Sequence, residues 1–246
     1  MRARLNGYLK IRSEKATRRV RQRMKRIPEE ELMLDEEQAR AYGKGEFEEP
    51  HSRFIERFRE RFFSDSIEGH VLDLGCGPAD ISLRFARSYS RCRIHGVDGS
   101  EAMLKIGRQA IRRAQLEQSI ELIHHLLPTP KLPRDRYEVV ISNSLLHHLK
   151  DPQVLWNSIG RFAGPAAPVF VMDLRRPGSE AQARELTELY SSDEPEILQR
   201  DFYQSLLAAY REDEVLGQLE QAGLAHFSVE VVSDRHFSVC GRGEKR

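Results

Sequence analysis

Short apolar runs alternate with amphipathic stretches along the chain from about residue 70 onward. Five runs rich in valine, isoleucine and leucine predict strands: "HVLDLG", "RIHGVD", "IELIHHL", "YEVVISN" and "APVFVMDL". Between them, "ADISLRFARSY", "SEAMLKIGRQAIRRAQL" and "DPQVLWNSIGRFA" repeat apolar residues at helical spacing and predict helices. Alternating strands and helices are typical of an α/β fold. The pattern therefore predicts a Rossmann-like, doubly wound and mostly parallel sheet.

The pattern changes toward the C-terminus. A helix predicted for "REDEVLGQLEQAG" precedes two alternating runs, "HFSVEVVSD" and "RHFSVCGR", which a tight Ser-Asp-Arg turn joins. These two runs predict an antiparallel hairpin at the edge of the sheet. Between the fifth strand and that helix, residues 176–212 form a long polar and aromatic insertion.

The charge is distributed unevenly along the chain. Of the 39 Lys and Arg and the 38 Asp and Glu, residues 1–26 contain eleven basic and one acidic, which leaves 28 and 37 for the rest. An acidic body is a poor surface for phosphate groups. We interpret residues 1–26 as a solvated basic extension; the alternatives are a nucleic-acid or anionic-membrane contact through this segment, or a translation start at Met24.

Residues 27–65 predict a helical cap. Pro28 followed by three Glu suits a helix N-terminus, and "PHSRFIERFRERFF" places apolar residues on one regular helical face. We expect residues 66–246 to form the main domain, with the insertion at 176–212 inside it.

Composition excludes several classes of protein. Hydrophobic residues make up 39% of the chain, and no run approaches the roughly 18 apolar residues that a membrane helix needs. The N-terminus lacks the apolar region of a secretory signal. The three cysteines form no CxxC pair, which argues against a disulfide framework and a zinc knuckle. We therefore expect a protein of the reducing cytoplasm.

The stretch "VLDLGCGPAD" carries the first candidate chemistry. Gly75 and Gly77 allow a tight turn and a close approach of the backbone to a ligand. A dinucleotide fingerprint needs a third glycine where this chain has Asp80, and Asp73 adds a second carboxylate, so the loop suits a cation better than a pyrophosphate. Asp98, 21 residues after Gly77, suits the two hydroxyls of a ribose. Together these residues predict a pocket for a nucleoside with a positively charged tail.

S-adenosylmethionine is such a molecule, and the chain resembles the class I S-adenosylmethionine-dependent methyltransferases. The resemblance is to the methyltransferase-domain group that includes quinone-type and other small-molecule enzymes. It rests on "VLDLGCGPAD", "GVDGSEAML", "YEVVISNSLLHHLKDP" and "VMDLRRP", in that order, and covers about residues 54–241.

The resemblance implies a set of cofactor-binding residues. Asp73, Gly75 and Gly77 would line the methionine end, Asp98 would take the ribose hydroxyls, Met103 would lie against the adenine and Asn143 near the sulfonium. The complete expected set is Asp73, Gly75, Cys76, Gly77, Asp98, Gly99, Met103, His125 and Asn143. Two departures stand out: Ala79 replaces a third glycine at little cost in size, and His124 and His125 occupy a place where the family often has an acidic residue.

Methyl transfer from a sulfonium is a direct displacement that mainly requires alignment and exclusion of water, so strong catalytic signals are not expected. A general base helps only where the acceptor carries a proton. The candidates are Asp173 at the end of the fifth strand, His147 in "SLLHHL" and His51 in the capping segment. A structural or cofactor-shaping role is the favoured alternative for His147, and a surface position is the alternative for His51.

Substrate and metal contacts have weaker signals. Arg175, beside Arg176, would bind an acidic substrate group, and a helix over "LQRDFYQSLLAAY" would carry Phe202, Leu206, Ala209 and Tyr210 on one face with Tyr203 alongside. We take Arg175, Tyr203 and Tyr210 as the substrate-binding candidates, with core packing as the alternative for the tyrosines. No metal is expected, because the pairs His124–His125 and His147–His148 are adjacent residues whose side chains should diverge.

The sequence thus predicts a cytoplasmic S-adenosylmethionine-dependent methyltransferase that acts on a small-molecule acceptor. One alternative is an RNA methyltransferase that captures its substrate with residues 1–26. A second alternative is a cofactor-binding scaffold protein without transferase activity.

Overall fold

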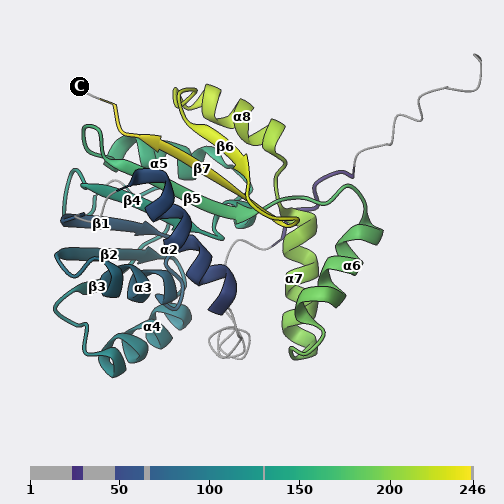
Figure 1. Ribbon diagram of the computed structural model, residues 1–246, viewed down its shortest axis with the longest axis horizontal. Helices are drawn as coiled ribbons and strands as arrows, with labels where there is room; N and C mark the ends of the chain where they lie inside the picture. The colour runs from purple at the N-terminus through teal and green to yellow at the C-terminus, as the bar shows by residue number, and fades with distance from the viewer. Residues whose placement is uncertain (1–23, 30–47, 64–66, 130, 245–246) are drawn as a thin grey trace, which may run out of the picture.

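The protein is built around one seven-stranded sheet in the order β3-β2-β1-β4-β5-β7-β6 (Figure 1). The computed structural model describes residues 24–29, 48–63, 67–129 and 131–244. The strands are β1 Gly69–Leu74, β2 Cys92–Asp98, β3 Ile120–His124, β4 Val139–Asn143, β5 Pro168–Leu174, β6 Ser228–Val231 and β7 His236–Arg242. The first five strands are parallel, and β7 runs antiparallel between β5 and β6. The predicted Rossmann-like sheet and its C-terminal hairpin are confirmed.

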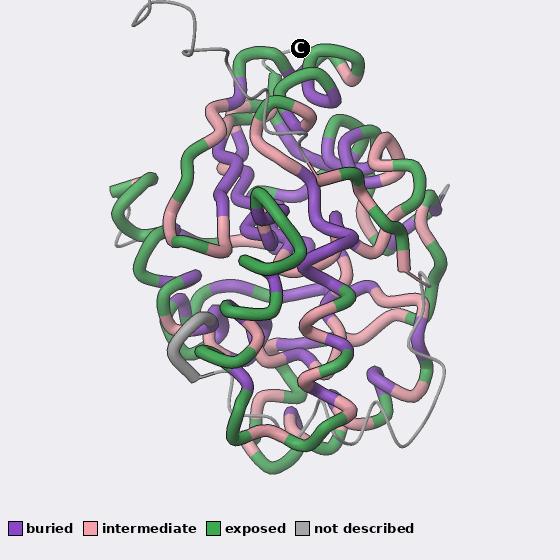
Figure 2. Tube along the Cα trace, turned by 90° about the vertical axis from the view of Figure 1, so that its right-hand side faces the viewer, coloured by how far each residue is buried: buried purple, intermediate pink, exposed green. Residues whose placement is uncertain are grey.

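Helices cover both faces of the sheet. α2 (Glu48–Phe62), α3 (Asp80–Ser88) and α4 (Glu101–Ala114) pack on one face, while α5 (Gln153–Phe162) and α8 (Glu212–Gln221) pack on the other. Each strand contributes side chains to the cores on both faces, because successive side chains of a strand point to opposite faces of the sheet. In β5, Phe170 and Met172 join the core under α2 and α3, and Val169 and Val171 join the core under α5 and α8. Figure 2 shows this buried centre enclosed by exposed segments.

α2 is part of the sheet's helical layer. Its Phe54 ring lies 4.9 Å from the ring of Phe170 in β5, and its Phe58 ring lies 5.0 Å from that of Phe85 in α3, both edge to face. Edge-to-face aromatic pairs add to the stability that burial provides. The helix predicted from "PHSRFIERFRERFF" therefore exists, but it packs along the sheet, and only its N-terminal end reaches the edge where the strands end.

The insertion after β5 is an α-helical hairpin. α6 (Glu180–Ser191) and α7 (Glu196–Ala208) lie beside the carboxyl ends of the parallel strands in Figure 1 and share a small apolar core with Leu174. No helix was expected at α6, because few apolar residues mark its buried face. The placement of Tyr210 on the helical face of "LQRDFYQSLLAAY" is wrong: α7 ends at Ala208, and Tyr210 instead forms an isolated bridge with Arg175.

Several expectations concern residues outside the described part. The basic segment up to residue 23 and the acidic stretch 30–47 belong to this group, so the predicted extension at 1–26 and most of the predicted cap remain predictions. Among the described helices, none has an apolar stretch of the length that a membrane crossing requires.

Candidate functional site

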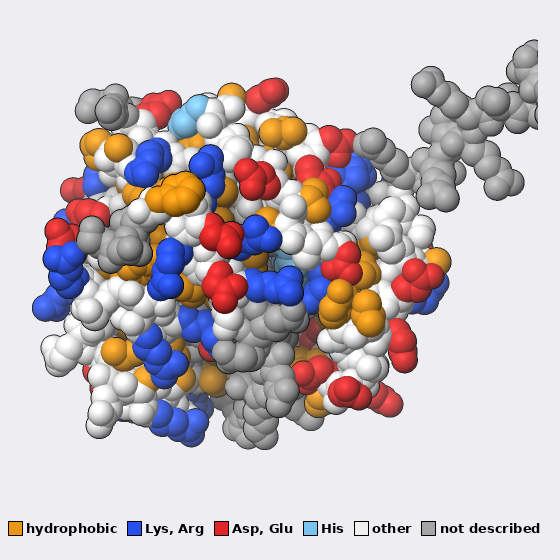
Figure 3. All heavy atoms as spheres, in the orientation of Figure 1, with side chains coloured by type: hydrophobic (Ala, Val, Ile, Leu, Met, Phe, Trp, Pro, Cys, Tyr) orange, Lys and Arg blue, Asp and Glu red, His pale blue; other side chains and the backbone are white. Residues whose placement is uncertain are grey.

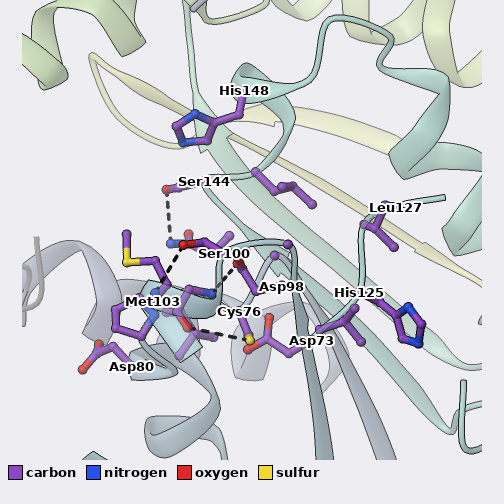
Figure 4. Close-up of a pocket in the computed structure, with 18 of the residues that line it drawn as sticks. Asp73, Cys76, Asp80, Asp98, Ser100, Met103, His125, Leu127, Ser144 and His148 are labelled. Carbon is purple, nitrogen blue, oxygen red and sulfur yellow. Dashed lines mark hydrogen bonds between the residues drawn. The ribbon is translucent and has the colours of Figure 1, made fainter. Parts of the chain in front are cut away.

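A pocket of about 290 Å³ opens at the edge where β1, β2 and β4 end. The loops after β1, β2, β3 and β4 form its wall, together with the starts of α3 and α4 and a residue of α2. Figure 4 shows the labelled side chains around the pocket. The carboxyl edge of an open parallel sheet is where such folds bind ligands. The volume is close to the lower end of the range for small-molecule sites, which begins at roughly 300 Å³.

The loop after β1 depends on its two glycines for shape. Gly75 has φ +72° and Gly77 has φ +51°, in the left-handed region that favours glycine. A Cβ at Gly75 would also lie 2.8 Å from Leu145 Cδ1, so the close approach of the two loops excludes a side chain there. Ala79 has φ +67° as well. The expectation of little cost at Ala79 is therefore wrong: the size of alanine fits, but its left-handed backbone conformation costs roughly 1–2 kcal/mol.

Asp98 ends β2 with its carboxylate held by the backbone of two loops. Gly77 N–H donates to Oδ2 at 2.8 Å and Ser100 N–H donates to Oδ1 at 2.7 Å. Burial raises the pKa of Asp98, and these two hydrogen bonds oppose that rise. Because each carboxylate oxygen has two lone pairs, the group is oriented and retains capacity to accept hydroxyl hydrogens from a ligand.

Asp73 lies at the floor of the pocket and is almost inaccessible, with 1% of its surface exposed. Ser82 Oγ–H donates to its Oδ2 at 2.6 Å. Burial, with a contribution from the nearby Asp98 carboxylate, raises the pKa of Asp73 to about 7, although the bond from Ser82 opposes this. A buried carboxyl group of this kind becomes fully ionised when a cation binds next to it.

All nine residues expected to bind the cofactor line this pocket: Asp73, Gly75, Cys76, Gly77, Asp98, Gly99, Met103, His125 and Asn143. Asn143 Oδ1 is buried and has no hydrogen-bond partner in the described part of the chain. A buried acceptor without a partner is uncommon in folded proteins, and here it belongs to a pocket wall. This arrangement fits a ligand that brings its own polar groups.

Of the three catalytic candidates, only His51 lines the pocket. Its Nδ1 lies 2.6 Å from Oδ2 of Asp80, which also accepts a hydrogen bond from Arg84 Nε at 2.7 Å. Burial alone would raise the pKa of Asp80, but the hydrogen bonds from His51 and Arg84 lower it below its ordinary value. Asp80 is therefore an ionised group at the pocket wall.

The other two catalytic candidates form a buried pair behind the pocket. His147 Nδ1 lies 2.6 Å from Asp173 Oδ1, and Asp173 Oδ2 accepts a hydrogen bond from Leu146 N–H at 2.7 Å. Burial alone would lower the pKa of His147, but Asp173 raises it above its ordinary value. Neither side chain lines the pocket, so the expectation that Asp173 faces an acceptor there is wrong.

The three substrate candidates also lie away from the pocket lining. Arg175 Nε pairs with Glu212 Oε1 at 2.6 Å, and Tyr210 O–H donates to Leu149 O at 2.9 Å. Tyr203 packs against the core of the helical hairpin, with the Arg184 guanidinium 5.7 Å from its ring centre. Arg175 therefore has an acidic partner outside this pocket, and these contacts favour the packing alternative for both tyrosines.

The pocket also has polar residues that were not among the expected site residues, including Ser100, Ser144 and His148. The string "SLLHHL" drew attention to His147, because a helix starting near Ser144 was expected. The chain instead forms a short 3₁₀ turn, η1 (Leu146–His148), so His148 faces the pocket while His147 is buried behind it. The expected helix was wrong because the local sequence does not specify whether this segment forms an α-helix or a 3₁₀ turn.

Comparisons with known proteins bear on this fold and pocket. Residues 71–165 match the family model of the methyltransferase domain. A solved S-adenosylmethionine-dependent methyltransferase of Aquifex aeolicus aligns with a TM-score of 0.62 over 85% of this chain and 98% of that one, at 17% identity. The fold of the chain is that of the class I S-adenosylmethionine-dependent methyltransferases, and residues 71–165 are similar to their methyltransferase domain. S-adenosylmethionine is the cofactor of this family.

Curated relatives of this chain are similar over part of their length. The trans-aconitate 2-methyltransferase of Delftia acidovorans is 29% identical over 176 residues, covering 66% of this chain and 60% of the relative. The demethylmenaquinone methyltransferase of Listeria welshimeri is 29% identical over 109 residues, covering 44% and 46%. The chain thus spans about half to three fifths of the relatives' lengths.

A further structural neighbour was solved with the cofactor. Phosphoethanolamine N-methyltransferase 2 of Haemonchus contortus, in complex with S-adenosyl-L-methionine, aligns with a TM-score of 0.63 over 86% of this chain and 58% of that one. Its sequence identity is 13%, so the likeness concerns the fold.

Proposed function

We propose that this methyltransferase moves the methyl group of S-adenosylmethionine to a small-molecule acceptor by direct displacement. The observation that carries the proposal is the pocket at the carboxyl edge, where Asp98 and Asp73 lie on neighbouring strands around the glycine loop. Their carboxylates suit a ligand with a diol at one end and a cation at the other, and a pyrophosphate has neither.

Each part of the pocket has a proposed task. Asp98 accepts the ribose hydroxyls, Met103 packs against the adenine, and Asp73 with the loop at Gly75 faces the charged methionine end. Asn143 Oδ1, which is buried without a partner in the described residues, takes a polar group of the ligand near the sulfonium. The bound cofactor supplies a methyl group already activated by its positive sulfur, so the protein's task is to align the reactants and exclude water.

The acceptor is proposed to enter between polar residues of the pocket wall that have no proposed contact with the cofactor. His51 with Asp80 stands on one side and His148 on another, and both histidines line the pocket. His51 is a group that can take a proton from an acceptor hydroxyl, thiol or ammonium. Trans-aconitate and demethylmenaquinone appear in the names of the relatives, which supports a small acceptor.

One face of the described residues also favours a small acceptor over RNA. Figure 3 shows acidic and basic side chains interspersed across the face seen in Figure 1, without a continuous basic stripe. Affinity for nucleic acid depends mainly on clustered positive charge that neutralises phosphates.

Replacing Asp98 with alanine is expected to weaken S-adenosylmethionine binding at least tenfold, or about 1.4 kcal/mol. The variant loses the acceptor of the ribose hydroxyls and the anchor of Gly77 N–H and Ser100 N–H. Isothermal titration calorimetry of the parent protein and of Asp98→Ala measures the change in affinity. Mass spectrometry after incubation with metabolite pools measures methylated product.

Glu101→Gln is the matched control, because Glu101 is exposed at the first turn of α4 and pairs with Arg108. This variant should bind like the parent protein. Absence of cofactor binding by the parent protein would refute the proposed function, whereas binding without product across broad acceptor pools would favour the scaffold alternative.

The pH dependence of cofactor binding provides an independent test of Asp73. Because its pKa is about 7 in the free protein, the group is largely protonated at pH 5.5, and binding of a cation must displace that proton. Affinity should therefore rise with pH, on the order of tenfold from pH 5.5 to 7, and level off above. Calorimetry in buffers of different ionisation enthalpy should show proton release near pH 7; Asp73→Asn should abolish both effects. An affinity independent of pH in the parent protein would contradict this role.

A further inference from the structure

Beside the pocket, a side-chain cluster outside the proposed cofactor contacts brings together Glu29, His147 and His148. Glu29 Oε1 lies 3.1 Å from His148 Nδ1 and 3.6 Å from His147 Nε2. One donor atom from each of the three residues lies within 4.8 Å of the others. Ligands of a tetrahedral zinc ion are about 3.3 Å apart, given bonds of about 2.0 Å, so the two measured separations bracket that spacing.

We propose that Glu29, His147 and His148 bind a divalent transition-metal ion of the zinc class. Two imidazoles and one carboxylate form the ligand set of catalytic zinc sites, which leave a position for another ligand. The proposal adds a metal site to the molecule and does not depend on the identity of the methyl acceptor.

The tautomer of His147 supports this assignment. A carboxylate only accepts hydrogen bonds, so the contact of 2.6 Å with Asp173 places a proton on His147 Nδ1. In a neutral ring, Nε2 then carries a lone pair directed toward Glu29, which also accepts only. Two acceptors face each other there, and either a further proton or a metal ion must lie between them. A histidine that donates its other nitrogen to a carboxylate is the usual arrangement around a protein metal.

The surrounding contacts hold all three ligands in place. Ser205 Oγ–H donates to the Glu29 carboxylate at 3.2 Å, and the His147 and His148 rings stack with centres 4.1 Å apart. Arg26 Nη2 donates to His147 O at 2.9 Å, which ties residues 24–29 to η1. Near the cluster, Glu29 and Asp173 contribute two negative charges against the one positive charge of Arg26, which favours a divalent cation.

The site revises an expectation from the sequence. Adjacent histidines were expected to diverge, and at His147–His148 this is wrong, because the 3₁₀ turn tilts the two rings by only 36° to each other. The third ligand comes from a segment 118 residues earlier in the chain, which no local spacing reveals. His124 and His125 do diverge: His124 Nε2 contacts Gly99 O at 3.0 Å, whereas His125 lines the pocket.

His148 lines the cofactor pocket as well as the cluster, so a metal held there would border the space for an acceptor. A bound zinc-class ion polarises oxygen ligands and stabilises a thiolate or alkoxide at neutral pH. This role of the metal toward the acceptor rests on the proposed function, whereas metal binding itself does not. It predicts that the acceptor presents a thiol, hydroxyl or carboxylate group to the metal.

Metal binding by the full chain, stripped with a chelator and titrated without S-adenosylmethionine, tests the proposal directly. We expect about one equivalent of Zn²⁺ to bind, and Co²⁺ to give visible d–d absorption bands that Zn²⁺ abolishes. Glu29→Gln and His148→Gln should each weaken Zn²⁺ binding at least tenfold. Asp173→Asn should weaken it by roughly 10–100-fold, as for other outer partners of metal ligands, because a neutral amide replaces the carboxylate that pairs with His147 Nδ1.

His70→Gln is the matched control, because His70 forms a similar pair with Glu138 (3.7 Å) at the opposite end of β1. This variant should leave Zn²⁺ affinity unchanged. The proposal would be overturned if the parent chain does not bind Zn²⁺, or if Glu29→Gln and His148→Gln bind it as tightly as the parent. A proton would then lie between His147 and Glu29. Because the titration contains no cofactor, this outcome is separate from any failure of S-adenosylmethionine to bind.

Discussion

Replacing Asp173 with alanine is expected to lower the free energy of unfolding by about 3–5 kcal/mol, the usual cost of breaking a buried charged pair. Asp173 is 1% exposed, and its carboxylate accepts hydrogen bonds from His147, Leu146 N–H and Leu174 N–H. Alanine leaves all three donors without this acceptor in a site that water does not reach. Urea unfolding followed by circular dichroism measures the change.

Two variants separate this effect from a general loss of charge. Asp173→Asn keeps one oxygen acceptor and should lose less stability than Asp173→Ala. Asp135→Ala removes an exposed carboxylate and should change the free energy of unfolding by no more than about 0.5 kcal/mol. If Asp173→Ala is as stable as Asp135→Ala, the pair with His147 has no structural importance.

Replacing Phe58 with alanine is expected to cost about 3–5 kcal/mol of stability, as for other large aromatic residues deleted from a core. Phe58 is fully buried, and its ring contacts Phe85 and Tyr89 as well as Phe170 of the sheet. The experiment tests whether α2 is an integral layer of the domain or a detachable cap. If α2 were a detachable cap, Phe58→Ala would leave the stability of the sheet domain nearly unchanged. Thermal and urea unfolding provide the measurement.

Phe63→Ala is the matched control at the end of the same segment. Its side chain is 90% exposed, so its removal should have little effect on stability. Equal and small effects of both substitutions would show that α2 does not belong to the helical layer of the domain.

Local patterns predict the central features of the fold for a physical reason. A parallel strand buried on both faces needs a continuous apolar run, and the helices between strands need one apolar face, so both leave a strong signal along the sequence. The glycine loop is equally local: the turn at Gly75 requires φ +72° and admits no side chain. Asp98 follows from the same logic, because the end of a predicted strand lies at the binding edge.

The residues around the acceptor space were less predictable, since their positions depend on contacts between distant segments. Arg175 and Tyr210 looked available, yet Glu212 and Leu149 O already engage them. Such partners follow from tertiary packing and have no fixed spacing in the sequence.

The sequence by itself determined the order of strands and helices, the conformation of the loop at Gly75 and Gly77, and the position of Asp98, because each depends on neighbouring residues. Only the tertiary structure decided that α2 packs on the sheet, that His148 rather than His147 faces the pocket, and that Glu29 meets both histidines. These outcomes depend on which distant surfaces bury each other, and a side chain's final partners are set by that packing.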